Sequence, residues 1–143
     1  MLAFSTRIPL TTRERTLLFP TGRYATNFRV PRNVARLPRK RRLQPRGHTV
    51  YRLSQQALLV FKPAGHREPE HTHPYSQTLH VVAGELAVTS KGRTVTLDAA
   101  SAPYRVRARE PHATHAMQPT WLVVTRHERD EGPATRQRRA GPS

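Results

Sequence analysis

The hydrophobic and polar residues between about positions 50 and 126 fall into short runs of strand length. Runs rich in Val, Leu, Thr and aromatic residues alternate with Gly, Pro and short polar segments, at intervals of roughly 8–12 residues. No helix-length pattern lies between these runs. Such punctuation is typical of an antiparallel β-sandwich or a small β-barrel. We therefore predict an all-β fold, with strand-forming runs at 50–63, 77–83, 85–90, 93–99, 104–108, 112–117 and 120–126.

The two flanks of this region have a different pattern. Residues 1–49 carry 12 Lys and Arg residues and one acidic residue, so this segment accounts for most of the net charge of +16. The segment is rich in Pro and Arg and shows no sustained strand or helix period, which predicts a disordered basic arm. Residues 127–143 are predicted to be a disordered tail. The predicted organisation is an arm (1–49), a β-barrel (50–126) and a tail.

Composition narrows the classes of function. The chain has no cysteine, which excludes disulfides, a thiolate nucleophile and a Cys-type zinc site. No apolar run approaches the ~20 residues that span a bilayer, and the N-terminus is a poor signal peptide, so we expect a cytoplasmic protein without membrane association. A body of about 77 residues buries only ~60% of the surface of its unfolded chain, and we expect a homodimer that covers an outer sheet face. The arm shows no nucleic-acid-binding motif, which leaves nucleic-acid association as the weakest hypothesis.

One segment carries candidate chemistry, the stretch GHREPEHTHPYSQTLHVVAG at 65–84. Five of its residues, Gly65, His71, His73, Gln77 and Gly84, are separated by five, one, three and six residues. This arrangement resembles the first motif of the cupin superfamily, with Gln77 at the position that usually holds Glu. The string HTHPYSQTLHVVAG is most similar to the small Mn-dependent hydroxynitrile-lyase-like cupins, which also use Gln there. The resemblance implies a jelly-roll barrel over about residues 50–126.

The second cupin motif is recognisable only by its histidine. When that histidine is placed on His112, Ser101, Arg107 and Arg109 stand where the family usually has Gly, Pro and Gly. Ala116 stands where Asn is usual. The motif lies at the expected distance downstream and precedes a strand-forming run, so we retain His112 as its histidine.

The resemblance implies a metal site formed by His71, His73, Gln77 and His112. Residues two apart in a strand share a face, so His71 and His73 are able to point into a barrel together. Gln77 follows a turn and is able to return an amide oxygen to the same point. His115 is the alternative to His112 as the third histidine. Three imidazoles and one amide oxygen suit Mn, Fe, Co, Ni or Zn, and the sequence does not select among these divalent ions.

These four ligands are uncharged, so a bound ion would keep its full charge. Such an ion favours an oxyanion or a carbonyl oxygen at an open position and acts as a Lewis acid. We therefore predict a metal-dependent enzyme for a small oxyanion- or carbonyl-bearing metabolite, of lyase, dioxygenase or isomerase type. The alternative is a non-catalytic cupin that binds a ligand or serves as a scaffold, which the altered second motif favours.

The sequence assigns no catalytic residue. Hydroxynitrile-lyase-like cupins use a further histidine late in the final strand, whereas residues 119–125 contain none and His127 falls beyond them. The acid–base candidates that remain are His115, Tyr75, Tyr104, Glu70 and Glu110. Three residues after Gln77, His80 belongs to the opposite face of its strand, where packing or an interface is expected. Three other histidines are expected to be solvated: His48, His66 and His127.

Overall fold

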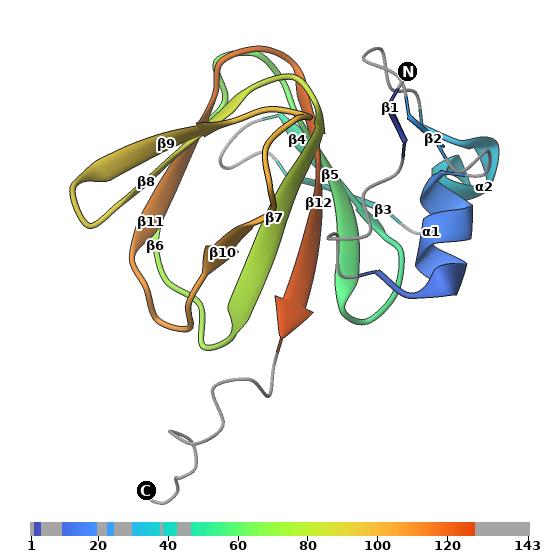
Figure 1. The fold of residues 1–143 in the computed structure, drawn as a ribbon, viewed down its shortest axis with the longest axis horizontal. Helices are drawn as coiled ribbons and strands as arrows, with labels where there is room; N and C mark the ends of the chain where they lie inside the picture. Colours follow the sequence, from blue (N-terminus) through green and yellow to red (C-terminus); the bar gives the residue numbers. More distant parts are fainter. Residues whose placement is uncertain are drawn as a thin grey trace, which may run out of the picture.

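The computed structural model describes residues 2–3, 10–19, 23–24, 30–37, 39–42 and 47–127. Within these residues the chain forms two antiparallel sheets that face one another, with two short helices beside the larger sheet (Figure 1). No helix in the described part of the chain is long and apolar enough to cross a membrane. The elements are β1 (Leu2–Ala3), α1 (Thr12–Leu18), β2 (Arg23–Tyr24), α2 (Arg32–Ala35), β3 (Arg39–Arg42), β4 (His48–Arg52), β5 (Ala57–Lys62), β6 (Arg67–His71), β7 (Ser76–Ala83), β8 (Leu86–Ser90), β9 (Arg93–Leu97), β10 (Tyr104–Val106), β11 (His112–Ala116) and β12 (Thr120–His127).

The strands are connected as in a jelly roll. The larger sheet has six strands in the order β10-β7-β12-β5-β4-β3, and the smaller has four in the order β6-β11-β8-β9. β1 and β2 form a separate pair. All pairings are antiparallel. The structure confirms the predicted all-β class and the small antiparallel barrel.

Side chains of the six-stranded sheet alternate between two apolar clusters. In β12, Leu122 and Val124 pack in the cluster between the sheets, whereas Val123 and the partly buried Trp121 belong to a second cluster on the outer face. This is the two-residue period of a strand, and here both faces are covered. A buried Leu such as Leu122 contributes about 1.5–3 kcal/mol through removal of its apolar surface from water. The alternation therefore determines which side chains of β4, β5, β7 and β12 face the barrel interior.

The outer face of the larger sheet is covered by the N-terminal helices. α1 begins with a capping box, in which the Thr11 hydroxyl accepts from the Glu14 amide and the Glu14 carboxylate accepts from the Thr11 amide. Leu18 and Val34 are buried in the outer cluster with Val123 of β12. Figure 1 shows both helices on the side of the sheet that faces away from the four-stranded sheet.

This covering differs from the disordered arm expected for residues 1–49. Residues 10–19 and 30–37 are ordered because their few apolar side chains find an apolar sheet face that the sequence pattern alone does not reveal. They also cover much of the surface for which a second copy was expected, and the homodimer stays a prediction. Within the arm the structure also describes residues 2–3, 23–24 and 39–42, which form β1, β2 and β3, and residues 47–49, which include the start of β4. The other residues of the arm, and the tail predicted at 127–143 apart from His127, lie outside the described residues.

The predicted strand runs were placed correctly in most cases, with two differences. The run 50–63 is two strands, β4 and β5, because the hydroxyl of Ser54 accepts from the amides of Gln56 and Ala57 and turns the chain. β6 was not predicted as a separate strand run. Its composition, REPEH, is polar, and its burial is low.

Gly84 closes the turn between β7 and β8 in a conformation that favours glycine. Its φ is +96°, and a Cβ at this position would meet the carbonyl oxygen of Pro119 and lie 2.6 Å from the hydroxyl of Thr120. Gly65, the first glycine of the motif, has φ +83° with open space around it. The final glycine of the motif is therefore required by a close backbone approach as well as by its φ.

Candidate metal centre

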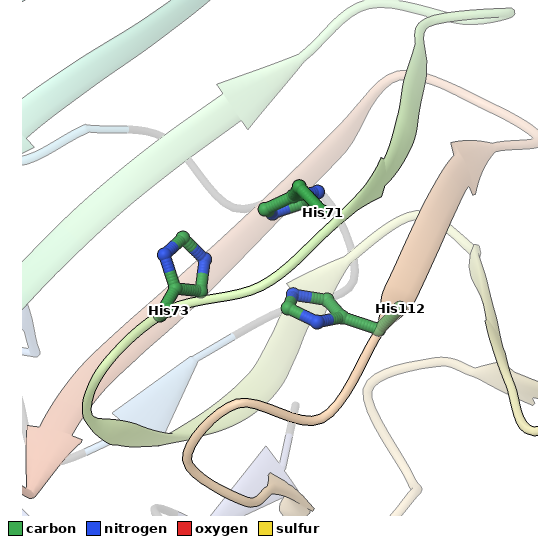
Figure 2. A group of neighbouring side chains, drawn as sticks. All are labelled: His71, His73 and His112. Carbon is green, nitrogen blue, oxygen red and sulfur yellow. The ribbon is translucent and has the colours of Figure 1, made fainter.

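Three histidines meet at one end of the barrel interior. His71 is the last residue of β6, His73 lies in the connection to β7, and His112 is the first residue of β11. His71 and His112 are directly paired across the β6–β11 ladder. One nitrogen of each ring lies within 4.8 Å of the corresponding nitrogen of the other two. Figure 2 shows the three rings turned toward a common point between the strands.

Hydrogen bonds at the far side of two rings determine which nitrogen is available. The Nδ1 of His71 lies 2.8 Å from the carbonyl oxygen of Pro69, and the Nδ1 of His112 lies 2.9 Å from that of Glu110. A carbonyl oxygen only accepts, so each Nδ1 carries the proton and donates it. In the neutral ring, the Nε2 of each histidine then carries the unprotonated lone pair that binds a metal.

His73 is held in a different way. Its ring stacks on Tyr75, with centroids 5.0 Å apart and 14° between the planes, and its Nδ1 lies 3.3 Å from the Tyr75 hydroxyl. Burial, followed by the charges that His71 and His112 would carry, lowers the pKa of His73 to about 4. Burial also lowers the pKa of His112. Both imidazoles are therefore neutral, and ready to act as ligands, at pH 7.

This donor set fits a divalent transition metal. Nitrogens that share one ion at about 2.1 Å in a tetrahedral set lie about 3.4 Å apart, so ring nitrogens that lie within 4.8 Å of one another need to close by at most about 1.4 Å. Gln77 lies on β7 with its side chain on the inner face and lines the same cavity. Among the described residues no hydrogen bond to the side-chain amide of Gln77 is found, which leaves the amide oxygen available. The role of Gln77 as fourth ligand stays a prediction.

His115 does not join this group. Within β11 it lies three residues beyond His112 and takes the other face of the sheet, in a shallow depression with Arg67 and Pro69. The alternative that placed His115 at the metal is therefore wrong, because the two-residue period of the strand separates it from His112.

One position of the altered second motif has a backbone conformation that favours glycine. Arg109, at a position where the family usually has Gly, is one of two described non-glycine residues with positive φ, at 62°. Its amide donates to the carbonyl oxygen of His73 over 2.7 Å. This bond ties the loop before His112 to the loop that carries His73.

The histidines open onto a cavity of about 580 Å³ between the sheets. This volume is suited to a small metabolite. Six apolar side chains from the larger sheet form most of one wall: Val50, Leu58, Val60, Leu79, Leu122 and Val124.

An ion pair between the buried Lys62 and the partly buried Glu68 lies in the cavity wall and was missed by the sequence analysis. The Lys62 ammonium is 3.0 Å from a carboxylate oxygen of Glu68 and 2.9 Å from the Thr114 hydroxyl. The Lys62 side chain is 6% exposed and that of Glu68 is 27% exposed. Burial by itself would raise the pKa of Glu68, but the charge and hydrogen bond of Lys62 lower it to about 2. The second oxygen of Glu68 lies 4.0 Å from the Nε2 of His71.

An irregularity in β6 places Glu68 beside the metal site. Glu68 and His71 are three positions apart, whereas their partners Thr114 and His112 are two positions apart, so the register shifts between these pairs. Such a bulge allows residues three apart to share a face. Glu68 therefore could not be placed from strand alternation, whereas Lys62 could have been, because it shares the inward period of Leu58 and Val60.

The other candidate side chains from the sequence lie in different environments in the structure. Of the five acid–base candidates only Tyr75 lines the cavity. His48 and His66 are 5% and 6% exposed and face each other with 3.2 Å between ring nitrogens, so the expectation that they are solvated is wrong. His48 lies on the inner side of β4 and lines the cavity, and His66, in the turn before β6, packs against its ring. His80 is buried on the outer face of β7, as predicted.

The sequence matches the cupin domain family over residues 57–125. Together with the barrel and the position of the histidines, this match supports the cupin superfamily as the class of this protein. None of the curated proteins matches the sequence. The resemblance to the hydroxynitrile-lyase-like cupins in particular stays a prediction.

Solved structures of similar fold are cupins and lyases at low sequence identity. KdgF from Halomonas sp. is 20% identical, with a TM-score of 0.53, over 59% of this chain and 84% of that chain. An RmlC-like cupin from Shewanella frigidimarina is 22% identical, with a TM-score of 0.48, over 55% of this chain and 72% of that one. A structure reported with the DMSP lyases RdDddP and RnDddQII is 16% identical, with a TM-score of 0.51, over 56% and 47%. At these identities the likeness concerns the fold alone.

Proposed function

We propose that this protein is a metal-dependent cupin enzyme that acts on a small oxyanion- or carbonyl-bearing metabolite. The observation that carries the proposal is the convergence of His71, His73 and His112 at the wall of a cavity of about 580 Å³. Gln77 is proposed as the fourth ligand. Manganese, iron, cobalt, nickel and zinc all suit this set.

A divalent ion in this site would supply Lewis-acid stabilisation of negative charge on a substrate oxygen. The side chains that line the cavity would supply the other interactions with a substrate. The Lys62–Glu68 pair presents a carboxylate oxygen beside His71, where it is able to accept a hydrogen bond from a bound substrate or water. The apolar side chains of the larger sheet would remove water from one side of a bound substrate, which would strengthen these polar interactions. The solved lyases of similar fold support an enzyme rather than a scaffold, as an analogy of fold.

Turnover that depends on metal tests this proposal. Small hydroxy and keto acids are offered to the purified protein, and any turnover should stop on chelation and return when one metal is restored. His112→Ala should lose both metal and turnover, whereas His115→Ala, a matched change on the opposite face of the same strand, should keep both. A parent protein that binds metal without turnover on any of these substrates would favour the non-catalytic alternative.

Nucleic-acid association through the basic arm, a homodimer and a cytoplasmic location remain predictions from the sequence. The ordered helices α1 and α2 use part of the arm for packing on the barrel. This packing gives residues 10–19 and 30–37 a structural role that does not require nucleic acid.

A further inference from the structure

Arg126 brings a second positive centre into the same cavity. It lies on the inner face of β12, two residues beyond Val124 and four beyond Leu122, and it lines the cavity with them. Its position in a run of apolar inward residues is unusual, because a charged group facing a barrel interior costs free energy unless it has a partner.

The described residues do not supply that partner. The guanidinium carbon lies 4.7 Å from the centre of the Tyr75 ring, a cation–π contact. No carboxylate of the described residues forms a salt bridge with Arg126, and its Nε is buried without a hydrogen-bond partner. Among the residues that the structure describes, Glu68 is the only carboxylate that lines the cavity, and it is already paired with Lys62. The guanidinium is therefore held in place by Tyr75 while its hydrogen-bonding edge remains available.

Arg126 is also close to the metal site. It is the direct cross-strand neighbour of Gln77 in the β7–β12 ladder, and side chains in such pairs start about 5 Å apart. Its stacking partner Tyr75 stacks in turn on His73.

Arg52 adds positive charge at the rim of the cavity. Its guanidinium is held by the carbonyl oxygens of Ser54 and Gln55, at 3.2 and 3.3 Å. The cavity lining thus contains Arg52, Arg126 and the Lys62–Glu68 pair, which leaves an excess of two positive charges before any metal is bound. An ion in the site would raise this excess further, so the cavity favours an anion strongly.

We propose that Arg126 binds a carboxylate group of the substrate while another oxygen of the same molecule coordinates the metal. The planar guanidinium matches the two oxygens of a carboxylate, which a point charge does not. This inference rests on the proposed function. It narrows the substrate class to small carboxylic acids that carry a second oxygen function a few bonds away, such as hydroxy, keto or dicarboxylic acids.

Calorimetric titration of cobalt-loaded protein with malonate tests this assignment, with neutral malonamide as the matched probe. Malonate should bind at least about tenfold more tightly than malonamide, and Arg126→Gln should weaken malonate binding at least about tenfold, the usual effect of losing a charged hydrogen-bonding partner. Arg93→Gln is the control, because it removes one positive charge from an exposed strand position outside the cavity. This control should change the affinity by less than about twofold, since exposed charges at a distance are screened.

Cobalt stoichiometry is measured for each variant, so that failure of the inference is distinct from failure of the proposed function. A parent protein that binds no cobalt contradicts the proposed function. Equal loading with malonate affinity within about twofold of the parent in Arg126→Gln overturns the role of Arg126. If Arg126→Gln does not fold, Arg126→Lys takes its place. That variant keeps the positive charge but loses the paired N–H donors of the guanidinium, and it should still weaken malonate binding at least about threefold. An unchanged affinity overturns the assignment.

Discussion

Replacing Lys62 with Met removes one partner of the buried pair in the cavity wall and keeps most of its apolar volume. In the folded protein the pKa of Glu68 is lowered from 4.5 to about 2. A shift of this size corresponds to about 3 kcal/mol of stabilisation. Because the folded-state pKa lies below the unfolded value, this stabilisation is present above pH 4.5 and is lost as the pH falls toward 2.

Lys62→Met should therefore lower the free energy of unfolding by about 2–3 kcal/mol at pH 7, because it leaves a partly buried carboxylate without a partner. The loss should be smaller at pH 4, where Glu68 without its partner takes up a proton. The double variant Lys62→Met/Glu68→Gln should recover much of the loss, since no buried charge then remains. The measurement is urea denaturation followed by circular dichroism, on metal-free protein, at both pH values.

A double-mutant cycle isolates the pair from the general effect of changing Lys62. Arg93→Met serves as a surface control and should change the free energy of unfolding by no more than about 0.5 kcal/mol. The reasoning is refuted if Lys62→Met costs less than about 1 kcal/mol at pH 7, or if it costs the same whether Glu68 or Gln occupies position 68.

Three further predictions concern the turn, the helices and the histidines. Gly84→Ala should destabilise the fold by about 2 kcal/mol more than Gly92→Ala, because both have positive φ but only Gly84 faces a backbone clash; equal losses by urea denaturation would contradict this. Leu18→Ala should cost about 2–5 kcal/mol while the exposed Arg13→Ala stays within about 0.5, and a neutral Leu18→Ala would argue against the packed helix. The metal-free protein should lose stability as the pH falls from 6.5 to about 4, because His73 takes up a proton in the unfolded chain at a higher pH than in the folded protein. His73→Ala should make the free energy of unfolding depend less steeply on pH in this range, and an unchanged dependence would contradict the prediction.

The barrel could be predicted from the sequence because its strands follow local rules. Short Val- and Leu-rich runs between Gly and Pro residues predicted β7, β8, β9, β11 and β12 closely. The helices α1 and α2 could not be predicted in the same way. Their apolar residues are few, and they are ordered by the outer face of a sheet assembled from distant strands.

Some residues of the candidate site could likewise be predicted from the sequence, whereas others could not. The spacing of the cupin motifs allowed three histidines to be proposed, because these motifs mark sequence positions whose side chains the barrel brings together. They are His71, His73 and His112. Glu68 could not, since a register shift changes which face it takes. Arg126 carried a signal in the sequence that was not used, because it continues the inward alternation of Leu122 and Val124 to the end of β12.

X-ray absorption spectroscopy of cobalt-loaded protein, combined with elemental analysis, tests the central claim most directly. The account predicts one ion per chain with three imidazole nitrogens and further oxygen ligands at about 2.0–2.2 Å. In His112→Ala the imidazole signal and the bound ion should be lost, whereas His115→Ala should match the parent. Ion binding that survives the loss of His112, or a first shell without imidazole, would contradict the account.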